Sequence, residues 1–67
     1  MKILNQHNKY ITDKYDHGTK LTHYEDKVQH MISNGYGSII IDGHKVCLED
    51  TYEADGEEYI LVNVEGI

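Results

Sequence analysis

Six carboxylates fall within ten residues in the carboxyl half of the sequence, and no basic residue interrupts them. They are Glu49, Asp50, Glu53, Asp55, Glu57 and Glu58. Carboxylates at this density can ligate a cation, act as acid and base in hydrolysis, or pair with the cationic side chains of a partner. The spacing and the expected positions of these residues decide among the three chemistries.

A calcium-binding loop of the EF-hand type needs oxygen ligands at positions 1, 3 and 5, glycine at position 6 and a bidentate glutamate at position 12. With Gly56 at position 6, Asp55 and Glu53 stand correctly at positions 5 and 3. Thr51 then stands at position 1 and Val62 at position 12, where no carboxylate is available. We therefore expect Asp55-Gly56 to form the turn of a hairpin and to bind no calcium.

The five histidines and Cys47 lack the spacing of a zinc site. His23 and His30 lie seven residues apart on an expected helix, which separates them by about 10 Å along its axis. His44 and Cys47 lie three residues apart on an expected strand, so their side chains point to opposite faces. The remaining histidines are His7 and His17. We expect no metal and no cofactor.

No arrangement typical of an enzyme is present. Cys47 stands near Glu49 and other acids, which disfavour the negatively charged thiolate that a nucleophile requires. The carboxylates are expected at a surface turn, and a chain of 67 residues is too short to build a deep cleft around them. A glycine-rich phosphate loop is also absent. We therefore expect a protein without catalytic residues.

The length allows one small domain, residues 1–67. A domain of this size buries only about 60% of the surface that its unfolded chain exposes, so it usually needs an additional source of stability. Cys47 is the only cysteine, which excludes a disulfide within one chain and is typical of a reducing cytoplasm. We expect a soluble cytoplasmic protein without a membrane segment, stabilised as a homodimer.

The charge is negative and unevenly distributed. The formal net charge is −6, with five lysines against four acids in residues 1–35 and one lysine against eight acids in residues 36–67. Arginine is absent, although it makes the commonest specific contact with bases. Proteins that bind nucleic acid neutralise phosphates with lysine and arginine, so we expect no direct binding to DNA or RNA.

The carboxyl half has the pattern of an antiparallel meander, with strands at about 37–42, 45–52 and 58–64. Asp42-Gly43 between strand residues predicts a two-residue type I′ turn, in which both positions have positive φ. Ala54-Asp55-Gly56 predicts a three-residue loop that ends in a bulge at the glycine.

These two turns assign the residues of the meander to two faces. The first turn pairs Ile39 with Val46, and the second pairs Leu48 with Val62. One face then collects the apolar residues Ile39, Ile41, Val46, Leu48, Ile60, Val62 and Val64. The other face is mixed and consists of Ile40, Lys45, Cys47, Glu49, Thr51, Tyr59, Leu61 and Asn63.

One helix, from about residue 23 to residue 33, is expected to cover the apolar face, which makes the fold class α+β. Thr22 and Glu25 have the spacing of a capping box, and Ser33-Asn34-Gly35 is typical of a helix end with Asn or Gly in the left-handed conformation. The apolar stripe of the helix consists of Tyr24, Val28, Met31 and Ile32.

Residues 1–21 are expected to add an amino-terminal strand or hairpin to an edge of the sheet. Residues 2–4 and 9–11 have the composition of short strands, and Gly18 lies at the centre of a turn pattern. The alternative for this segment is that it folds over the mixed face.

The acidic residues fit a surface that binds a basic protein, with solubility as the simpler alternative. Two carboxylates separated by one residue on a strand lie about 6.6 Å apart, which is the scale on which phosphates repeat along DNA. A surface of one sign can occupy the basic groove of a DNA-binding protein, and the opposite charges steer the two proteins together.

In overall character the chain resembles the small early proteins of phages that infect AT-rich bacteria. It is short, acidic, free of arginine and proline, and rich in lysine, isoleucine, asparagine and tyrosine. Several proteins of that kind are DNA mimics that inhibit nucleoid proteins, glycosylases, nucleases or polymerase subunits of the host. The resemblance implies an inhibitor of a basic DNA-binding protein in the host cytoplasm. It includes no motif, so it assigns no role to any single residue.

A second hypothesis is a structural or regulatory interaction module. Such a module would bind a partner, or a second copy of itself, through Ile40, Tyr59 and Leu61 on the mixed face. The carboxylates would then only keep the protein soluble.

Overall fold

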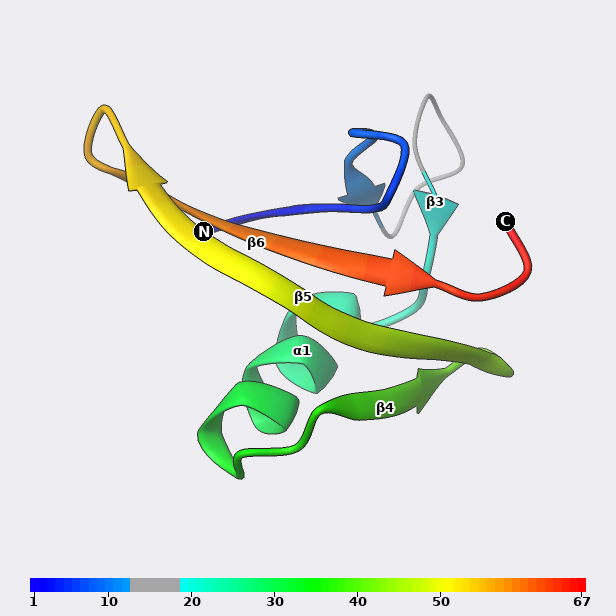
Figure 1. The fold of residues 1–67 in the computed structure, drawn as a ribbon. Helices are drawn as coiled ribbons and strands as arrows, with labels where there is room; N and C mark the ends of the chain where they lie inside the picture. Colours follow the sequence, from blue (N-terminus) through cyan, green and yellow to red (C-terminus); the bar gives the residue numbers. More distant parts are fainter. Residues whose placement is uncertain (13–18) are drawn as a thin grey trace.

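The structure, a computed structural model, describes residues 1–12 and 19–67. A four-stranded sheet has the order β1-β6-β5-β4, in which β1 is parallel to β6 and the other neighbours are antiparallel (Figure 1). β2 and β3 form a separate parallel pair. Along the chain the elements are β1 (Lys2–Leu4), β2 (Ile11–Thr12), β3 (Thr19–Lys20), α1 (Tyr24–Ser33), β4 (Ser38–Ile41), β5 (His44–Ala54) and β6 (Glu57–Val64). The predicted α+β class is confirmed, and the meander is extended by an amino-terminal strand.

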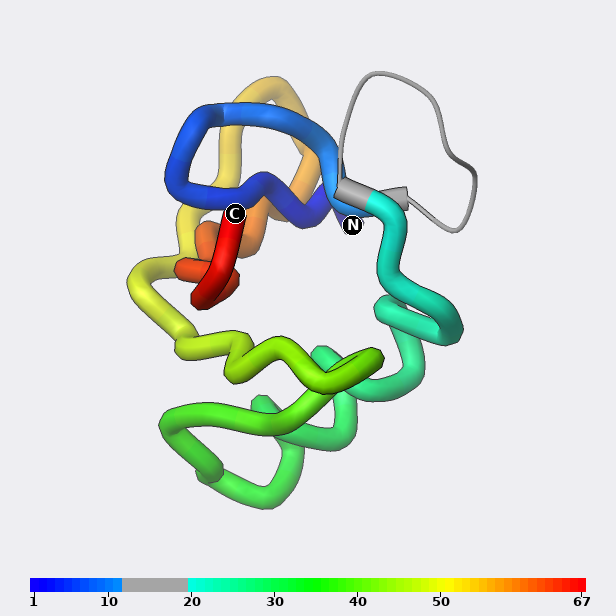
Figure 2. Tube along the Cα trace, turned by 90° about the vertical axis from the view of Figure 1, so that its right-hand side faces the viewer, coloured from blue at the N-terminus to red at the C-terminus, as the bar shows by residue number. Residues whose placement is uncertain are grey.

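The core lies between the sheet and α1. Figure 2 shows α1 and the segment that leads into it on one side of the curved sheet. We call this side of the sheet the inner face; its residues are Ile3, Ile39, Ile41, His44, Val46, Leu48, Thr51, Glu53, Glu58, Ile60, Val62 and Val64. The buried apolar residues form one cluster of Ile3, Ile11, Leu21, Val28, Met31, Ile41, Val46, Ile60, Val62 and Val64. Each large side chain buried there stabilises the fold by about 1.5–3 kcal/mol.

The carboxyl end of α1 forms as predicted, but its amino end does not. Gly35 is left-handed with φ 70°, and the Tyr36 amide donates to Met31 O at 2.9 Å, so Gly rather than Asn ends the helix. At the other end the predicted capping box is wrong. The N-cap is His23, with φ 55° and no side-chain cap, because the amide of Thr22 donates instead to Asp42 Oδ2 at 2.7 Å.

The two hairpin turns have the same type. Asp42-Gly43 is the predicted two-residue turn, with φ of 50° and 82°. The predicted three-residue loop at residues 54–56 is wrong, since Asp55-Gly56 also forms a two-residue turn, with φ of 53° and 76°. The extra residue is Glu49, which forms a bulge between the Leu48–Val62 and Asp50–Leu61 pairs.

The bulge determines which face each residue beyond it occupies. Thr51 lies opposite Ile60 on the inner face, so its predicted place on the mixed face is wrong. Tyr52 lies opposite Tyr59 on the other side, which we call the outer face. The residues of the outer face are Lys2, Leu4, Ser38, Ile40, Lys45, Cys47, Asp50, Tyr52, Tyr59, Leu61 and Asn63.

The amino-terminal segment adds a strand to the sheet and side chains to the core. The strand predicted at residues 2–4 is β1, whereas the one predicted at 9–11 occurs as β2, Ile11–Thr12. Ile11 and Leu21 are buried among the inner-face residues, so the described part of residues 1–21 contributes to the core. The predicted turn at Gly18 lies outside the described residues.

Candidate protein-interaction surface

The β5–β6 hairpin projects beyond the rest of the sheet. β4 pairs with β5 only over His44–Cys47, whereas β5 continues to Ala54. The tip of the hairpin consequently lies away from α1 and β4 (Figure 1). We call residues 49–58, which contain all six carboxylates of the predicted site, the acidic arm.

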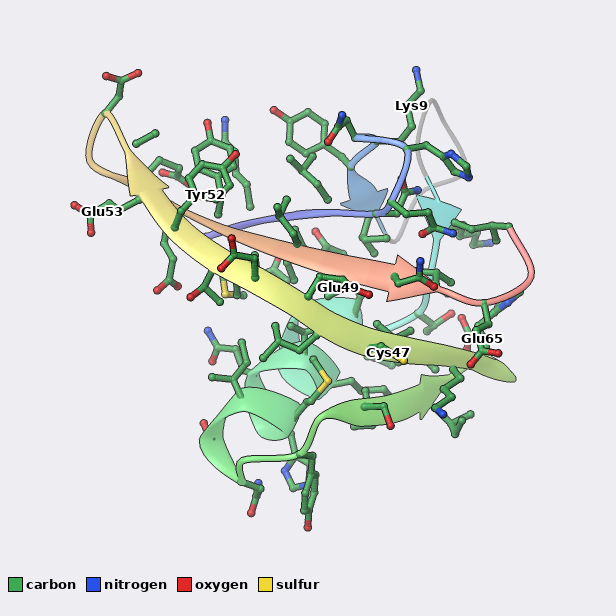
Figure 3. The ribbon with its side chains drawn as sticks, viewed as in Figure 1. Lys9, Cys47, Glu49, Tyr52, Glu53 and Glu65 are labelled. Atoms are coloured by element: carbon green, nitrogen blue, oxygen red, sulfur yellow. The ribbon has the colours of Figure 1, made fainter. Side chains whose placement is uncertain are left out.

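The arm spreads its carboxylates over both faces and the tip. Asp50 lies on the outer face opposite Leu61, and Asp55 lies in the turn. Figure 3 shows Glu49 near the middle of β5 and Glu53 near the tip. Five of the six residues are exposed; Glu57 is partly buried and binds the amino group of Met1 through Oε1 at 3.0 Å.

Glu53 and Glu58 lie directly opposite each other across the hairpin. Cβ atoms of such pairs are about 4.5–5.5 Å apart, and like charges at this position destabilise a sheet. Neither carboxylate forms an ion pair with another described residue. The pair therefore concentrates negative charge at a cost to the stability of the fold.

A cleft of about 350 Å³ lies between α1 and the inner face of the hairpin. Its apolar lining residues are Met1, Ile32 and Ile60, and its polar lining residues include Thr51 and Glu58. Gln29 and Ser33 complete the lining. Sequence reasoning missed this cleft, because Thr51 reaches the inner face only through the bulge at Glu49.

The outer face carries an aromatic cluster. Tyr52 and Tyr59 stack with ring centroids 5.0 Å apart and planes within 9°, and Tyr52 remains 43% exposed. Leu4 lies beside Leu61 in β1 and forms a bridge with Tyr10. Tyr52, Tyr10 and Leu4 were not predicted for this surface; a two-residue turn at Asp55-Gly56 would have indicated the pairing of the two stacked tyrosines.

The three residues predicted for the mixed face are separated. Tyr59 and Leu61 are half-buried on β6, while Ile40 is 59% exposed on β4, with β5 between them. Lys45 lies opposite Ile40, and Asp50 lies opposite Leu61. The apolar residues of this face therefore form two groups, with charged residues of β5 between them.

The rings of His7 and His44 both lie beside the carboxyl-terminal residues, with His7 Nε2 3.4 Å from the carbonyl oxygen of Ile67. His44 Nδ1 lies 2.8 Å from the carbonyl oxygen of Glu65, and the His30 ring meets Tyr36 edge-on at 5.9 Å. Cys47 is a partly buried residue of the outer face. Within residues 1–12 and 19–67, no three His, Cys, Asp or Glu side chains are placed to hold a metal ion. His17 lies outside those residues.

Comparisons with protein-family models, with curated proteins and with solved structures found no match to the chain. None of the described helices is long and apolar enough to cross a membrane.

Proposed function

We propose that the protein is a non-enzymatic inhibitor or adaptor that binds a basic DNA-binding protein through the acidic arm. In this role the arm takes the place of DNA, and the partner is a nucleoid protein, glycosylase, nuclease or polymerase subunit. The observation that carries the proposal is the projecting hairpin, whose carboxylates include an opposed pair, Glu53 and Glu58, neither of which forms an ion pair with another described residue. Such a pair weakens the sheet and strengthens the attraction of a cationic surface.

The shape of the arm supports this proposal. A two-stranded hairpin is narrow enough to enter a groove, and its tip carries Asp55 in the turn with Glu53 close behind it near the end of β5. Carboxylates on both faces and at the tip would contact opposite walls of a groove at once. A homodimer, which we also propose, would present two such arms.

The test is capture by an affinity column with a matched control column. One column carries the tagged protein, and the other carries the variant Glu53→Gln, Asp55→Asn, Glu58→Gln. A nuclease-treated bacterial lysate is passed over both and eluted with rising salt. We expect a basic DNA-binding protein on the first column only, released by moderate salt and displaced by duplex DNA. Equal retention on both columns would refute a role for the arm.

A second candidate function is association through the outer face, as a structural or regulatory module. The stacked pair Tyr52 and Tyr59 favours it, because aromatic side chains are enriched at protein interfaces. This function predicts association that is insensitive to salt and is lost in Leu61→Lys. The neutral triple variant of the arm would bind normally in this case.

A further inference from the structure

We propose that the partner contributes an extended basic segment, which adds as a strand to the open edge of β5 and places a lysine or arginine side chain in the cleft beside α1. The inference rests on the proposed function, because it names the part of the basic partner that the acidic arm receives. It follows from three features of the structure: an open strand edge, the direction of its backbone groups, and the chemistry of the cleft.

The two sides of the hairpin differ in how their edges are covered. β1 pairs with β6 at Tyr59–Leu61, and the side chain of Gln6 continues that cover by hydrogen bonding both backbone groups of Val64. On the other side, β4 ends its pairing with β5 at Cys47, and the Leu48 amide donates to Gly37 O at 3.0 Å. No described strand pairs with that edge of β5 from residue 49 to residue 54.

Alternation along the hairpin shows which backbone groups point out of that edge. Ala54 and Glu57 flank the two-residue turn and form its first hydrogen-bonded pair, so Glu53 belongs to a pair whose backbone groups point outward. The backbone groups of Thr51, two residues earlier on β5, point in the same outward direction. Its amide donates to Asp50 Oδ1 at 2.8 Å, away from β6, as this assignment requires. The Thr51 amide is therefore already bound to a side chain, and the outward backbone groups of Glu53, which no described strand pairs, are the template for an added strand.

An added strand would direct alternate side chains toward the cleft. The cleft is lined by the apolar residues Ile32, Ile60 and Met1 and by Glu58, which lies opposite Glu53 on the hairpin. A lysine or arginine side chain fits this arrangement, since its methylene groups cover apolar surface while its cationic end reaches the carboxylates. A volume of about 350 Å³ is at the lower end of that of ligand pockets and suits one such side chain.

Charge selects a basic segment over a second copy of this chain as the occupant. Two β5 edges paired with each other would bring the carboxylates of Glu49, Asp50 and Glu53 from both copies together. A segment that alternates basic and β-branched residues reverses the sign of these contacts and has the strand propensity that the edge requires.

The test uses a fluorescent octapeptide of alternating lysine and valine and a control octapeptide of four lysines followed by four valines, with binding measured by fluorescence anisotropy at low salt. We expect the alternating peptide to bind the whole protein at least fivefold more tightly than the block peptide. Amide hydrogen exchange at Glu53 should slow in the complex. Equal affinities together with unchanged exchange at Glu53 would overturn the inference.

Two pairs of variants separate the edge and the cleft from charge alone. Glu53→Pro removes the outward amide, whereas Glu53→Gln removes only the charge. We expect the affinity for the alternating peptide to fall at least tenfold in Glu53→Pro and about twofold to fivefold in Glu53→Gln. Ile32→Lys places a cation in the cleft, at a helix residue that is already 38% exposed, with Ile32→Gln as its neutral control. We expect the affinity for the alternating peptide to fall tenfold or more in Ile32→Lys but not in Ile32→Gln.

The outcomes also separate this inference from the proposed function. If Glu53→Pro and Glu53→Gln bind alike and Ile32→Lys binds normally, the edge and the cleft are not the site, while the capture of a salt-sensitive basic protein would still support the acidic arm. If the columns retain no such protein and neither peptide binds, both proposals fall.

Discussion

The side-chain amide of Gln6 pairs with the backbone of Val64 as a neighbouring strand residue would. Its Nε2 donates to Val64 O at 2.8 Å, and its Oε1 accepts from Val64 N at 2.9 Å. β1 ends at Leu4, so Gln6 satisfies backbone groups of β6 that the strand itself does not reach.

Replacing Gln6 should therefore loosen the end of β6. We expect Gln6→Ala to lower the free energy of unfolding by about 1–2 kcal/mol, because two hydrogen bonds to partly buried backbone groups are lost. Gln6→Glu should be similarly destabilised at neutral pH, since a carboxylate accepts from the Val64 amide but repels the Val64 carbonyl oxygen. Urea denaturation measures both effects, and faster exchange of the Val64 amide would locate them. Unchanged midpoints in both variants would show that the contact contributes nothing.

A charge reversal at Glu58 should change stability and binding in opposite directions. Glu58→Lys replaces a repulsive cross-strand pair with an attractive one, so we expect a gain of about 0.2–1 kcal/mol in low salt. The same change should weaken binding to a basic partner, because it inserts a cation into the acidic arm. Thermal denaturation and the affinity column measure the two effects.

Glu65→Lys is the matched control for Glu58→Lys. Glu65 is exposed and lies beyond the end of β6, so its reversal changes the net charge equally without altering the Glu53–Glu58 pair. We expect no gain in stability and a smaller loss of binding. If the two variants behave alike, net charge alone accounts for the effects.

The sequence was sufficient to predict those parts of the fold that depend on local chemistry. Asp42-Gly43 requires positive φ at both positions, and Gly35 ends α1 for the same reason, so both features are visible in a few adjacent residues. The apolar alternation then identified the inner face. Thr22 had the local pattern of a cap as well, but its amide is bound by Asp42, twenty residues away in sequence, which no local pattern reveals.

The candidate surface was less predictable, because it depends on where one extra residue is accommodated. The predicted bulge at the turn and the observed bulge at Glu49 both place Leu48 opposite Val62. Only the residues of β5 between Glu49 and the turn lie on different faces in the two arrangements. Thr51 consequently moves to the cleft, and Tyr52 moves beside Tyr59. The carboxylates themselves were found from composition, but their grouping depends on this register.

Asp42 should make the stability depend on pH in the acid range. Its pKa is lowered because its carboxylate accepts a hydrogen bond from the Thr22 backbone amide, with smaller contributions from the Thr22 side chain and from the positive charge of Lys27. A lowered folded-state pKa stabilises the fold above the ordinary aspartate range, near pH 4, and this contribution is lost as the pH falls through the folded-state value. We expect Asp42→Asn to be less stable than the parent protein at pH 7, with a difference that narrows as the pH falls below about 4.

Asp55→Asn is the control for Asp42→Asn. Both aspartates occupy the first position of an Asp-Gly turn that also accepts Asn-Gly, so both variants keep their turns. Asp55 lies at the tip of the hairpin, and no described amide donates to its carboxylate. Urea midpoints at several pH values should separate the two variants most at pH 7 and less as the pH falls. A difference that does not narrow in acid would mean that the charge of Asp42 is not the cause.

Deleting Glu49 should remove the bulge and leave the pairing of β5 and β6 unchanged. Leu48 would still lie opposite Val62 and Asp50 opposite Leu61, because Glu49 is the one residue between these pairs. We expect a folded protein whose free energy of unfolding falls by about 1 kcal/mol or less, as for an exposed residue.

Deleting Cys47 also shortens β5 by one residue, but we expect it to destabilise the protein much more than the deletion of Glu49. Closing the bulge would then turn Leu48 to the outer face and place Glu49 opposite Val62, which is buried. Loss of a leucine from the core and burial of a carboxylate should cost about 3 kcal/mol or more, a large part of the stability of a small domain. Urea denaturation, with cross-strand nuclear Overhauser effects between Asp50 and Leu61, would distinguish the two deletions. If the Glu49 deletion unfolds as readily as the Cys47 deletion, the twist at the bulge, and not the register alone, is required by the fold.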